Sequence, residues 1–232
     1  MPYRITARAE QKRQNMRQAL ITTARRLFVR QGYEATTMQH IVREAGTSIG
    51  NCYYYFPTKE ALLRAIVEDF AQHIGQSIDA AITSLPAGPE QLAIALAQAV
   101  RATLAQADLA RILLVETHIP ELRATVLNYF ISRLSRLLEA GNLANGNLPL
   151  KLATLAWQGT TFQVLESAIM GTIEEDEHTI ARFLVQWNLR ALGVPEERIG
   201  QALSSLEPFL VQSSLEETAK PARAAQRLAE EM

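Results

Sequence analysis

Residues 37–56 constrain the fold more than any other part of the chain. They read TMQHIVREAGTSIGNCYYYF, with a short apolar segment of helical period on either side of Gly46. Thr37 and Ser48 stand where helix N-caps are expected, and glycine tolerates the left-handed conformation that turns a chain between two helices. The pattern predicts two short helices joined by a tight turn, which is a helix-turn-helix.

The remainder of the chain is also patterned for helices. Leu and Ala dominate, aromatic residues make up 6% of the chain, and no run alternates like a strand. Glycine- or proline-rich segments separate the apolar stretches. Helices are expected over residues 14–31, 38–45, 48–55, from 59 onward, and over 91–106, 109–117, 122–140, 150–170, 178–192 and 196–206. The sequence therefore predicts an all-α fold.

Charge is distributed unevenly along the chain. Residues 1–64 carry eleven Lys or Arg against four Glu, a net charge of +7, whereas the whole chain has a net charge of -1. A basic first quarter joined to an acidic remainder suggests that only the first part meets a polyanion such as nucleic acid. The alternative at this point is an ordinary solvated helix surface.

Composition and termini indicate the compartment. The N-terminal stretch is charged with no apolar segment behind it, which predicts no secretory signal. No window approaches the roughly 18–20 apolar residues of a membrane span. The single cysteine, Cys52, cannot form an internal disulfide and is interpreted as a small core residue. A cytoplasmic protein without a membrane contact is expected.

Motifs of common enzymes are missing from the sequence. It contains no HExxH, no GxSxG, no P-loop and no dinucleotide-binding glycine pattern. The four histidines are scattered, and the single Glu-x-x-His, at Glu175 and His178, lacks the second pair that a di-iron bundle needs. We expect no catalysis, no cofactor and no metal site.

The segments LFVRQGYEATTMQHIV (27–42) and GTSIGNCYYYFPTKEALL (46–63) resemble the TetR family of transcriptional regulators. The resemblance covers about residues 14–70 and rests on several residues at fixed spacing. It implies an N-terminal three-helix DNA-binding head with a helix-turn-helix, followed by a C-terminal helical ligand-binding and dimerisation domain. The expected regions are a basic N-terminal arm (1–13), the head (14–60), the regulatory and dimerisation domain (61–213) and a charged tail (214–232).

The resemblance implies roles for particular residues of the head. Thr37 and Lys59 would hold backbone phosphates. Asn51 is the best candidate for direct base readout, because its amide can bond adenine with two hydrogen bonds. The residues expected to contact DNA are Thr37, Gln39, Ser48, Ile49, Gly50, Asn51, Tyr53, Tyr54 and Lys59. The basic arm could add a phosphate or minor-groove contact, or it could be a disordered tail.

The C-terminal part yields two further sets of candidates. Apolar and small residues on several sides of two late helices suggest a homodimer interface, the alternative being a single monomeric core; the candidates are Ala153, Ala156, Gly159, Thr160, Phe183, Leu184, Trp187 and Ala191. Pocket candidates, each of which could instead be ordinary core, are Phe70, Ile74, Leu104, Leu113, Glu116, His118, Tyr129, Phe130, Trp157, Phe162 and Glu166.

Together these features predict a ligand-responsive DNA-binding regulator. The favoured hypothesis is a homodimeric repressor that a small hydrophobic effector releases from a palindromic operator in double-stranded DNA. The alternative is a helical ligand-carrier or interaction protein that keeps the helix-turn-helix only as a packing unit.

Overall fold

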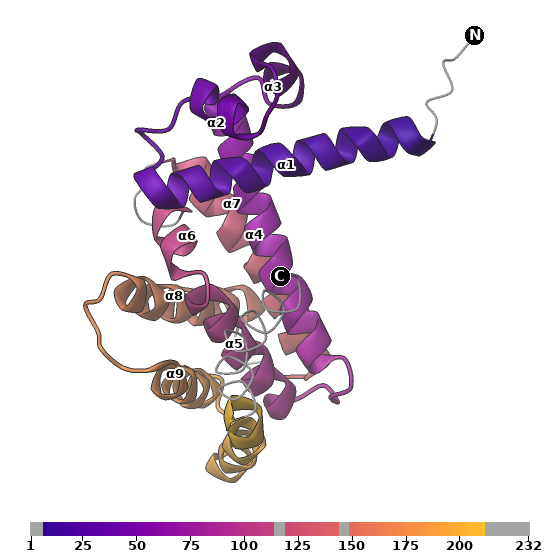
Figure 1. Ribbon diagram of the computed structural model, residues 1–232. Coiled ribbons are helices and arrows are strands. Elements are labelled where there is room, and N and C mark those ends of the chain that lie inside the picture. The colour runs from indigo at the N-terminus through magenta and orange to yellow at the C-terminus, as the bar shows by residue number, and fades with distance from the viewer. Residues whose placement is uncertain (1–6, 114–118, 144–148, 212–232) are drawn as a thin grey trace, which may run out of the picture. The chain divides into compact units, whose positions relative to one another are not determined.

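The computed structural model describes residues 7–113, 119–143 and 149–211 of the 232-residue chain (Figure 1). Over these ranges the regular secondary structure is helical, which confirms the predicted all-α fold. None of the helices in these ranges is long and apolar enough to cross a membrane. The predicted tail, residues 214–232, lies outside the described residues.

The helices are α1 (Ala7–Gln31), α2 (Met38–Glu44), α3 (Ile49–Tyr55), α4 (Lys59–Ile82), α5 (Pro89–Leu104), α6 (Ala107–Arg111), α7 (Pro120–Ala140), α8 (Leu150–Ile169) and α9 (Glu177–Ala191), and residues 196–211 are also helical. Apart from α1, each helix starts within two residues of its predicted start. The predicted boundary after residue 60 falls inside α4.

The start of α1 differs from the prediction. This helix begins at Ala7, seven residues before the expected start at Gln14. The prediction relied on the apolar stripe of the helix, which does not extend into residues 7–13. Those residues are mostly Ala, Arg, Glu, Gln and Lys, which favour helix without any packing, and Gln11 donates a hydrogen bond to Asn15 one turn later (2.9 Å).

The described residues form two compact units. Unit 1 runs up to His73 and adds residues 106–128, and unit 2 holds residues 74–105 and those from Tyr129 on. In unit 1, α1 packs against α2 and α6, and α2 against α3. Its core includes Leu20, Ala24, Leu27, Phe28, Ile41, Cys52, Phe56, Leu62, Leu63 and Ile66. The inward packing of Cys52 and Phe56 is as predicted.

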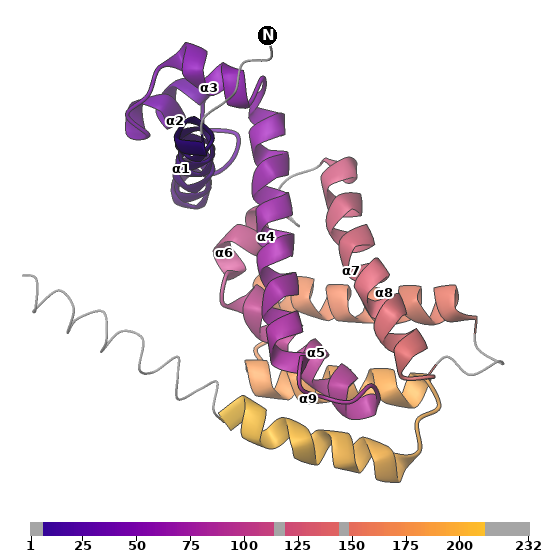
Figure 2. The same cartoon turned by 90° about the vertical axis from the view of Figure 1, so that its right-hand side faces the viewer.

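Unit 2 is built around α5. Every residue of α5 from Leu92 to Gln98 is buried, because α9 lies along this helix and α8 packs against both (Figure 2). The helix over residues 196–211 adds Leu206 and Leu210 to the same core. Unit 2 is therefore a helical layer with its own apolar interior.

Candidate nucleic-acid interface

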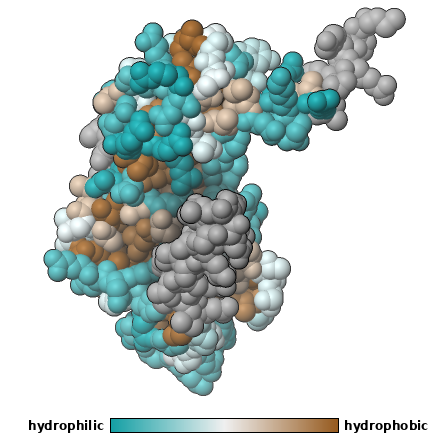
Figure 3. All heavy atoms as spheres, viewed as in Figure 1, coloured by the Kyte–Doolittle hydropathy of each residue, from teal (hydrophilic) through white to brown (hydrophobic). Residues whose placement is uncertain are grey.

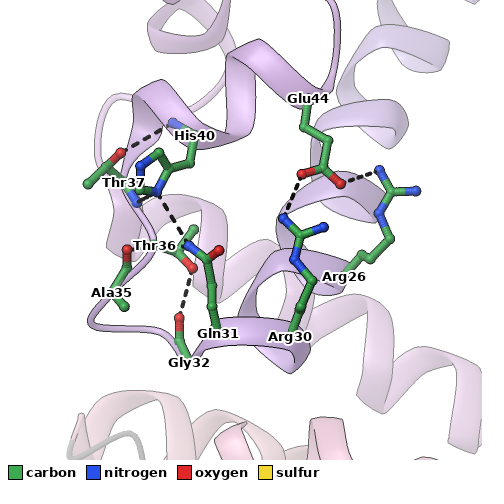
Figure 4. A network of polar contacts seen from close by, with 9 residues as sticks. All are labelled: Arg26, Arg30, Gln31, Gly32, Ala35, Thr36, Thr37, His40 and Glu44. Atoms are coloured by element: carbon green, nitrogen blue, oxygen red, sulfur yellow. Dashed lines mark hydrogen bonds and ion pairs between the residues drawn. The ribbon is translucent and has the colours of Figure 1, made fainter.

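Two side-chain caps and a glycine fix the helix-turn-helix. The Thr37 hydroxyl accepts a hydrogen bond from the His40 amide (3.2 Å), and the Thr37 amide donates to Nδ1 of His40 (3.4 Å), which completes a capping box (Figure 4). The Ser48 hydroxyl accepts from the Asn51 amide at the start of α3 (3.1 Å). Gly46 has φ +64°, in the left-handed region that glycine adopts without strain. The predicted caps and turn are confirmed.

Polar contacts also tie α1 to α2. Arg26 and Arg30 of α1 both pair with the carboxylate of Glu44, at 2.8 and 3.0 Å (Figure 4). Exposed pairs of this kind contribute little stability, typically about 0–1 kcal/mol. Their main consequence is electrostatic. Because both guanidinium groups already have a carboxylate partner, they add less positive charge to the surface than unpaired arginines would.

The outer side of α3 exposes large side chains. Cys52 and Phe56 hold this helix in the core, whereas Ile49 is 40%, Tyr53 48% and Tyr54 67% exposed. Burial raises the pKa of the Cys52 thiol, which keeps it neutral in its apolar surroundings. A helix packed on one side and open on the other has the shape that enters a major groove.

Asn51 is partly engaged within the protein. Its side-chain amide donates a hydrogen bond to the Thr47 hydroxyl (2.8 Å), and the residue is half-buried. An amide group carries two N–H donors and an accepting oxygen, so one donor and the oxygen remain for an adenine. The contact also fixes the orientation of the amide, a feature that the sequence analysis missed.

Lys59 is held by Tyr33, another contact that the sequence analysis missed. Its ammonium donates to the backbone carbonyl of Tyr33 (2.9 Å) and lies 4.1 Å from the centroid of the Tyr33 ring. The Tyr33 hydroxyl in turn donates to Glu60 (3.4 Å), and burial followed by the charges of Glu60 and Glu34 raises its pKa far above the ordinary value. Two of the three ammonium protons stay available for a phosphate.

All nine residues predicted to contact DNA lie in unit 1. Seven of them are exposed, and Asn51 and Lys59 are half-buried. Gly50 has no heavy atom within 4 Å of where a Cβ would stand, so its part of α3 is open to a large partner. Contact of these residues with DNA stays a prediction.

The predicted pocket residues do not fall in one unit. Phe70 and Leu113 belong to unit 1, and Glu116 and His118 lie outside the described residues. The others, Ile74, Leu104, Tyr129, Phe130, Trp157, Phe162 and Glu166, belong to unit 2. An effector pocket built from them stays a prediction.

A cleft that the sequence analysis missed lies in unit 1. It has a volume of about 480 Å³ and is lined by Gln18, Ile21, Thr22, Arg25, Arg26, Val29, Arg30 and Asp69. Seven of these side chains come from one side of α1. The cleft contains none of the residues predicted for the effector pocket.

Two of the residues predicted for the dimer interface are buried within unit 2, and the interface itself stays a prediction. They are Ala153 and Leu184, which α8 and α9 turn inward to the core. Thr160 is half-buried and donates to the carbonyl of Ala156. Ala156, Gly159, Phe183, Trp187 and Ala191 are exposed as expected. The structure adds Leu152, Leu155 and Met170 to the exposed apolar residues.

Eight of the ten large apolar side chains that are exposed within the described ranges fall into two groups. Three are on α3, and five are on α8, its C-cap Met170 and α9. In the second group, the rings of Phe183 and Trp187 stack with their centroids 6.0 Å apart. Clusters of exposed apolar side chains mark surfaces that meet a partner.

Within the described residues, no group of His, Cys, Asp or Glu could hold a metal ion.

Comparisons with known proteins agree with the geometry of the head. The model for bacterial regulatory proteins of the tetR family matches residues 20–66. The HTH-type transcriptional regulator EthR of Mycolicibacterium smegmatis is 30% identical over 73 residues, 32% of this chain and 34% of that protein. QacR of Staphylococcus aureus, also an HTH-type transcriptional regulator, is 42% identical over 53 residues, 23% and 28% of the two chains. The chain thus spans about a third of the length of these relatives.

A solved structure extends the similarity beyond the head. RolR in complex with the ligand resorcinol superposes with a TM-score of 0.63 at 26% sequence identity, over 83% of this chain and 95% of that chain. The two proteins therefore share the fold of both their N-terminal and C-terminal parts.

Proposed function

We propose that this chain is a ligand-responsive transcription repressor of the TetR family that binds operator DNA, and the match of its residues 20–66 to the model for bacterial regulatory proteins of the tetR family supports the proposal. The observation that carries the proposal is α3, which Ser48 caps and Cys52 fixes in the core while Tyr53 and Tyr54 remain exposed. The net charge of +7 over residues 1–64 attracts the phosphate backbone to this part of the chain.

In the proposed complex, α3 enters the major groove. Asn51 reads a base edge, and its contact with Thr47 orients the amide before DNA arrives. Thr37 and Lys59 hold phosphates on either side and set the register of the helix on the duplex. Lys59 brings an ammonium already positioned by Tyr33, which reduces the entropy lost on binding.

We further infer that the protein acts as a homodimer through the exposed apolar side of α8 and α9. Phe183 and Trp187 are each about half exposed, a costly arrangement for stacked aromatic rings in water. A two-fold interface presents two α3 helices at once. They fit successive major grooves when they lie about 34–36 Å apart, which requires a palindromic operator.

The proposed effector is a small hydrophobic molecule. The support is the likeness to RolR, whose structure contains resorcinol, together with the apolar side chains predicted for the pocket. A ligand that prefers a dimer with the wrong separation of its heads lowers operator affinity by population shift. Without the ligand, repression requires only that the protein occupy the promoter. This takes place in the cytoplasm and involves no catalysis. The carrier alternative is not favoured, because the curated relatives EthR and QacR are HTH-type transcriptional regulators.

Asn51→Ala tests base readout. On a duplex selected from a random library, the variant is expected to lose about 1–3 kcal/mol of discrimination at one base position, because a bidentate contact to the base is gone. The measurement is binding to single-base variants of that duplex. Gln39 and Tyr53 remain in place, so preference at the other positions is expected to stay. An unaltered preference at every position would remove Asn51 from base recognition.

Lys59→Ala tests the phosphate contact. Removal of one contact is expected to weaken binding to all sequences and to lower the slope of log affinity against log salt by about one unit. Arg111→Ala is the control, because this exposed cation of unit 1 is paired with Asp108 (3.7 Å) and is not expected to meet DNA. Equal slopes for both variants and the wild type would show that Lys59 serves only to hold Tyr33.

A further inference from the structure

The first half of α1 is a basic and largely exposed helix. Every residue from Arg8 to Ala19 is exposed except Met16, which is half-buried. The buried residues of α1 begin only at Leu20. Figure 3 shows hydrophilic side chains along this projecting part, and Figure 1 shows it extending past α2 and α3. A largely exposed helix of about 13 residues is only marginally stable in water by itself, so a partner that binds this segment would also stabilise its helix.

The cations of α1 differ sharply between its two halves. In the second half, Arg25 donates to the side chain of Gln106, and Arg26 and Arg30 pair with Glu44. In the first half, Arg8 and Lys12 have no polar partner within the described ranges.

The other cations of the first half are also poorly neutralised. Arg13 has only a 4.0 Å contact with Glu10, with both groups largely exposed. Arg17 packs its guanidinium 5.4 Å from the centroid of the Phe56 ring, which supplies no negative charge. Residues 7–19 thus present a net charge of +3 to solvent.

The basic segment contacts the C-terminal end of α3 through Arg17. Phe56, which lies under Arg17, is the C-cap of α3 and follows the exposed Tyr53 and Tyr54. Arg8 stands nine residues before Arg17, about 14 Å along a helix that rises about 1.5 Å per residue. That length corresponds to about four steps of a duplex at about 3.4 Å each. The basic surface therefore continues outward from the end of α3.

We propose that the first half of α1, residues 7–19, is a second DNA-binding element, in which Arg8, Lys12 and Arg13 hold phosphates beyond those reached by the helix-turn-helix. The inference rests on the proposed function, because it requires α3 to lie on the same duplex. Duplex DNA suits this surface better than a membrane does. A membrane-bound amphipathic helix needs a broad apolar side, and Met16 is the one large apolar residue of the segment.

Contacts of this kind add affinity without adding sequence preference. Lysine and arginine side chains on a solvated helix meet phosphate oxygens, which are the same at every base pair. Each phosphate neutralised releases counterions and contributes about 0.9 to the slope of log affinity against log salt. The segment is therefore expected to set the salt dependence of binding and to leave the choice of operator to α3.

The test is the variant Arg8→Gln/Lys12→Gln/Arg13→Gln, measured with the full chain on a selected operator duplex. Loss of three phosphate contacts lowers the salt slope by about 2.7, so that from 50 to 200 mM salt the wild type loses about 40-fold more affinity than the variant does. The order of preference among single-base variants of the duplex stays the same. Gln favours helix nearly as well as Lys and Arg, and far-UV circular dichroism checks that helix content is kept.

Two controls separate charge from structure. Arg8→Lys/Arg13→Lys keeps both charges and is expected to keep the wild-type slope. Arg26→Gln removes a cation of the same helix that is already paired with Glu44, and is also expected to leave the slope unchanged. If Arg26→Gln lowered the slope by as much per charge removed as the triple variant does, the inference would be overturned, because any cation of α1 would then have the same effect.

The remaining outcomes are decisive as well. If the wild type selects an operator and the triple variant has the wild-type slope, the inference fails while the proposed function stands. If the variant keeps that slope but loses binding to phosphatidylserine vesicles, the surface belongs to a membrane and the inference is again wrong. If the wild type selects no sequence, both the proposed function and this inference fall.

Discussion

Phe28→Ala is expected to destabilise the helix-turn-helix unit by about 3–5 kcal/mol, because it leaves a cavity in a closely packed core. Phe28 is completely buried, and its ring meets the edge of Tyr33 with centroids 5.2 Å apart. Domains of ordinary stability unfold at a cost of about 5–15 kcal/mol, so the expected loss is a large share of such a free energy of unfolding. Urea unfolding followed by far-UV circular dichroism measures the change.

The chain supplies a matched control for this substitution in the next residue. Val29 is 41% exposed, and Val29→Ala is expected to change stability by no more than about 0.5 kcal/mol. The two tryptophans of the chain, Trp157 and Trp187, both belong to unit 2, so fluorescence follows that unit separately. Equal effects of Phe28→Ala and Val29→Ala would contradict the core described for unit 1.

Phe183→Asp/Trp187→Asp is expected to turn the proposed dimer into a monomer. The two rings of each protomer would bury about 400 Å² of aromatic surface per dimer, on the order of 10 kcal/mol. The introduced carboxylates would also place four like charges in the proposed interface. Sedimentation at micromolar concentration is expected to report a monomer, and affinity for a palindromic duplex to fall by at least about 100-fold because a single head remains.

Val211→Asp is the control for the dimer variant. Val211 is an equally exposed apolar residue of unit 2, at 55%, but it lies outside α8 and α9. This variant is expected to stay dimeric and to bind the palindrome as the wild type does. Dissociation by Val211→Asp, with Phe183→Asp/Trp187→Asp still dimeric, would locate the interface elsewhere on unit 2.

The head was predictable from sequence because its determinants are local. Thr37 and Ser48 cap helices within three residues of themselves, and Gly46 turns the chain at its own position. The burial of Cys52 and Phe56 follows from helical period, since the residues are four apart on one side of α3. These signals act within a single helical turn and do not depend on contacts with the rest of the chain.

Features that depend on distant residues were not predictable. Lys59 contacts Tyr33, which lies 26 positions earlier in the sequence, and no local pattern predicts that contact. In α8, apolar residues surround the helix, so the sequence could not tell that Ala153 points inward while Leu152 is 61% exposed. The start of α1 was missed for a different reason. Its first residues are exposed, so they show no periodic pattern of apolar side chains from which a helix could be predicted.

Selection of bound duplexes from a random DNA library by the purified protein, at one moderate salt concentration, tests the central proposal most directly. The proposal predicts enrichment of a palindrome whose half-sites are centred about one helical turn apart, roughly 10–10.5 base pairs or a multiple of it. Such a result supports both the reading head and the dimer. Recovery of no preferred sequence, with weak binding that disappears as salt rises, would contradict the proposal and leave non-specific electrostatic attraction as the whole effect.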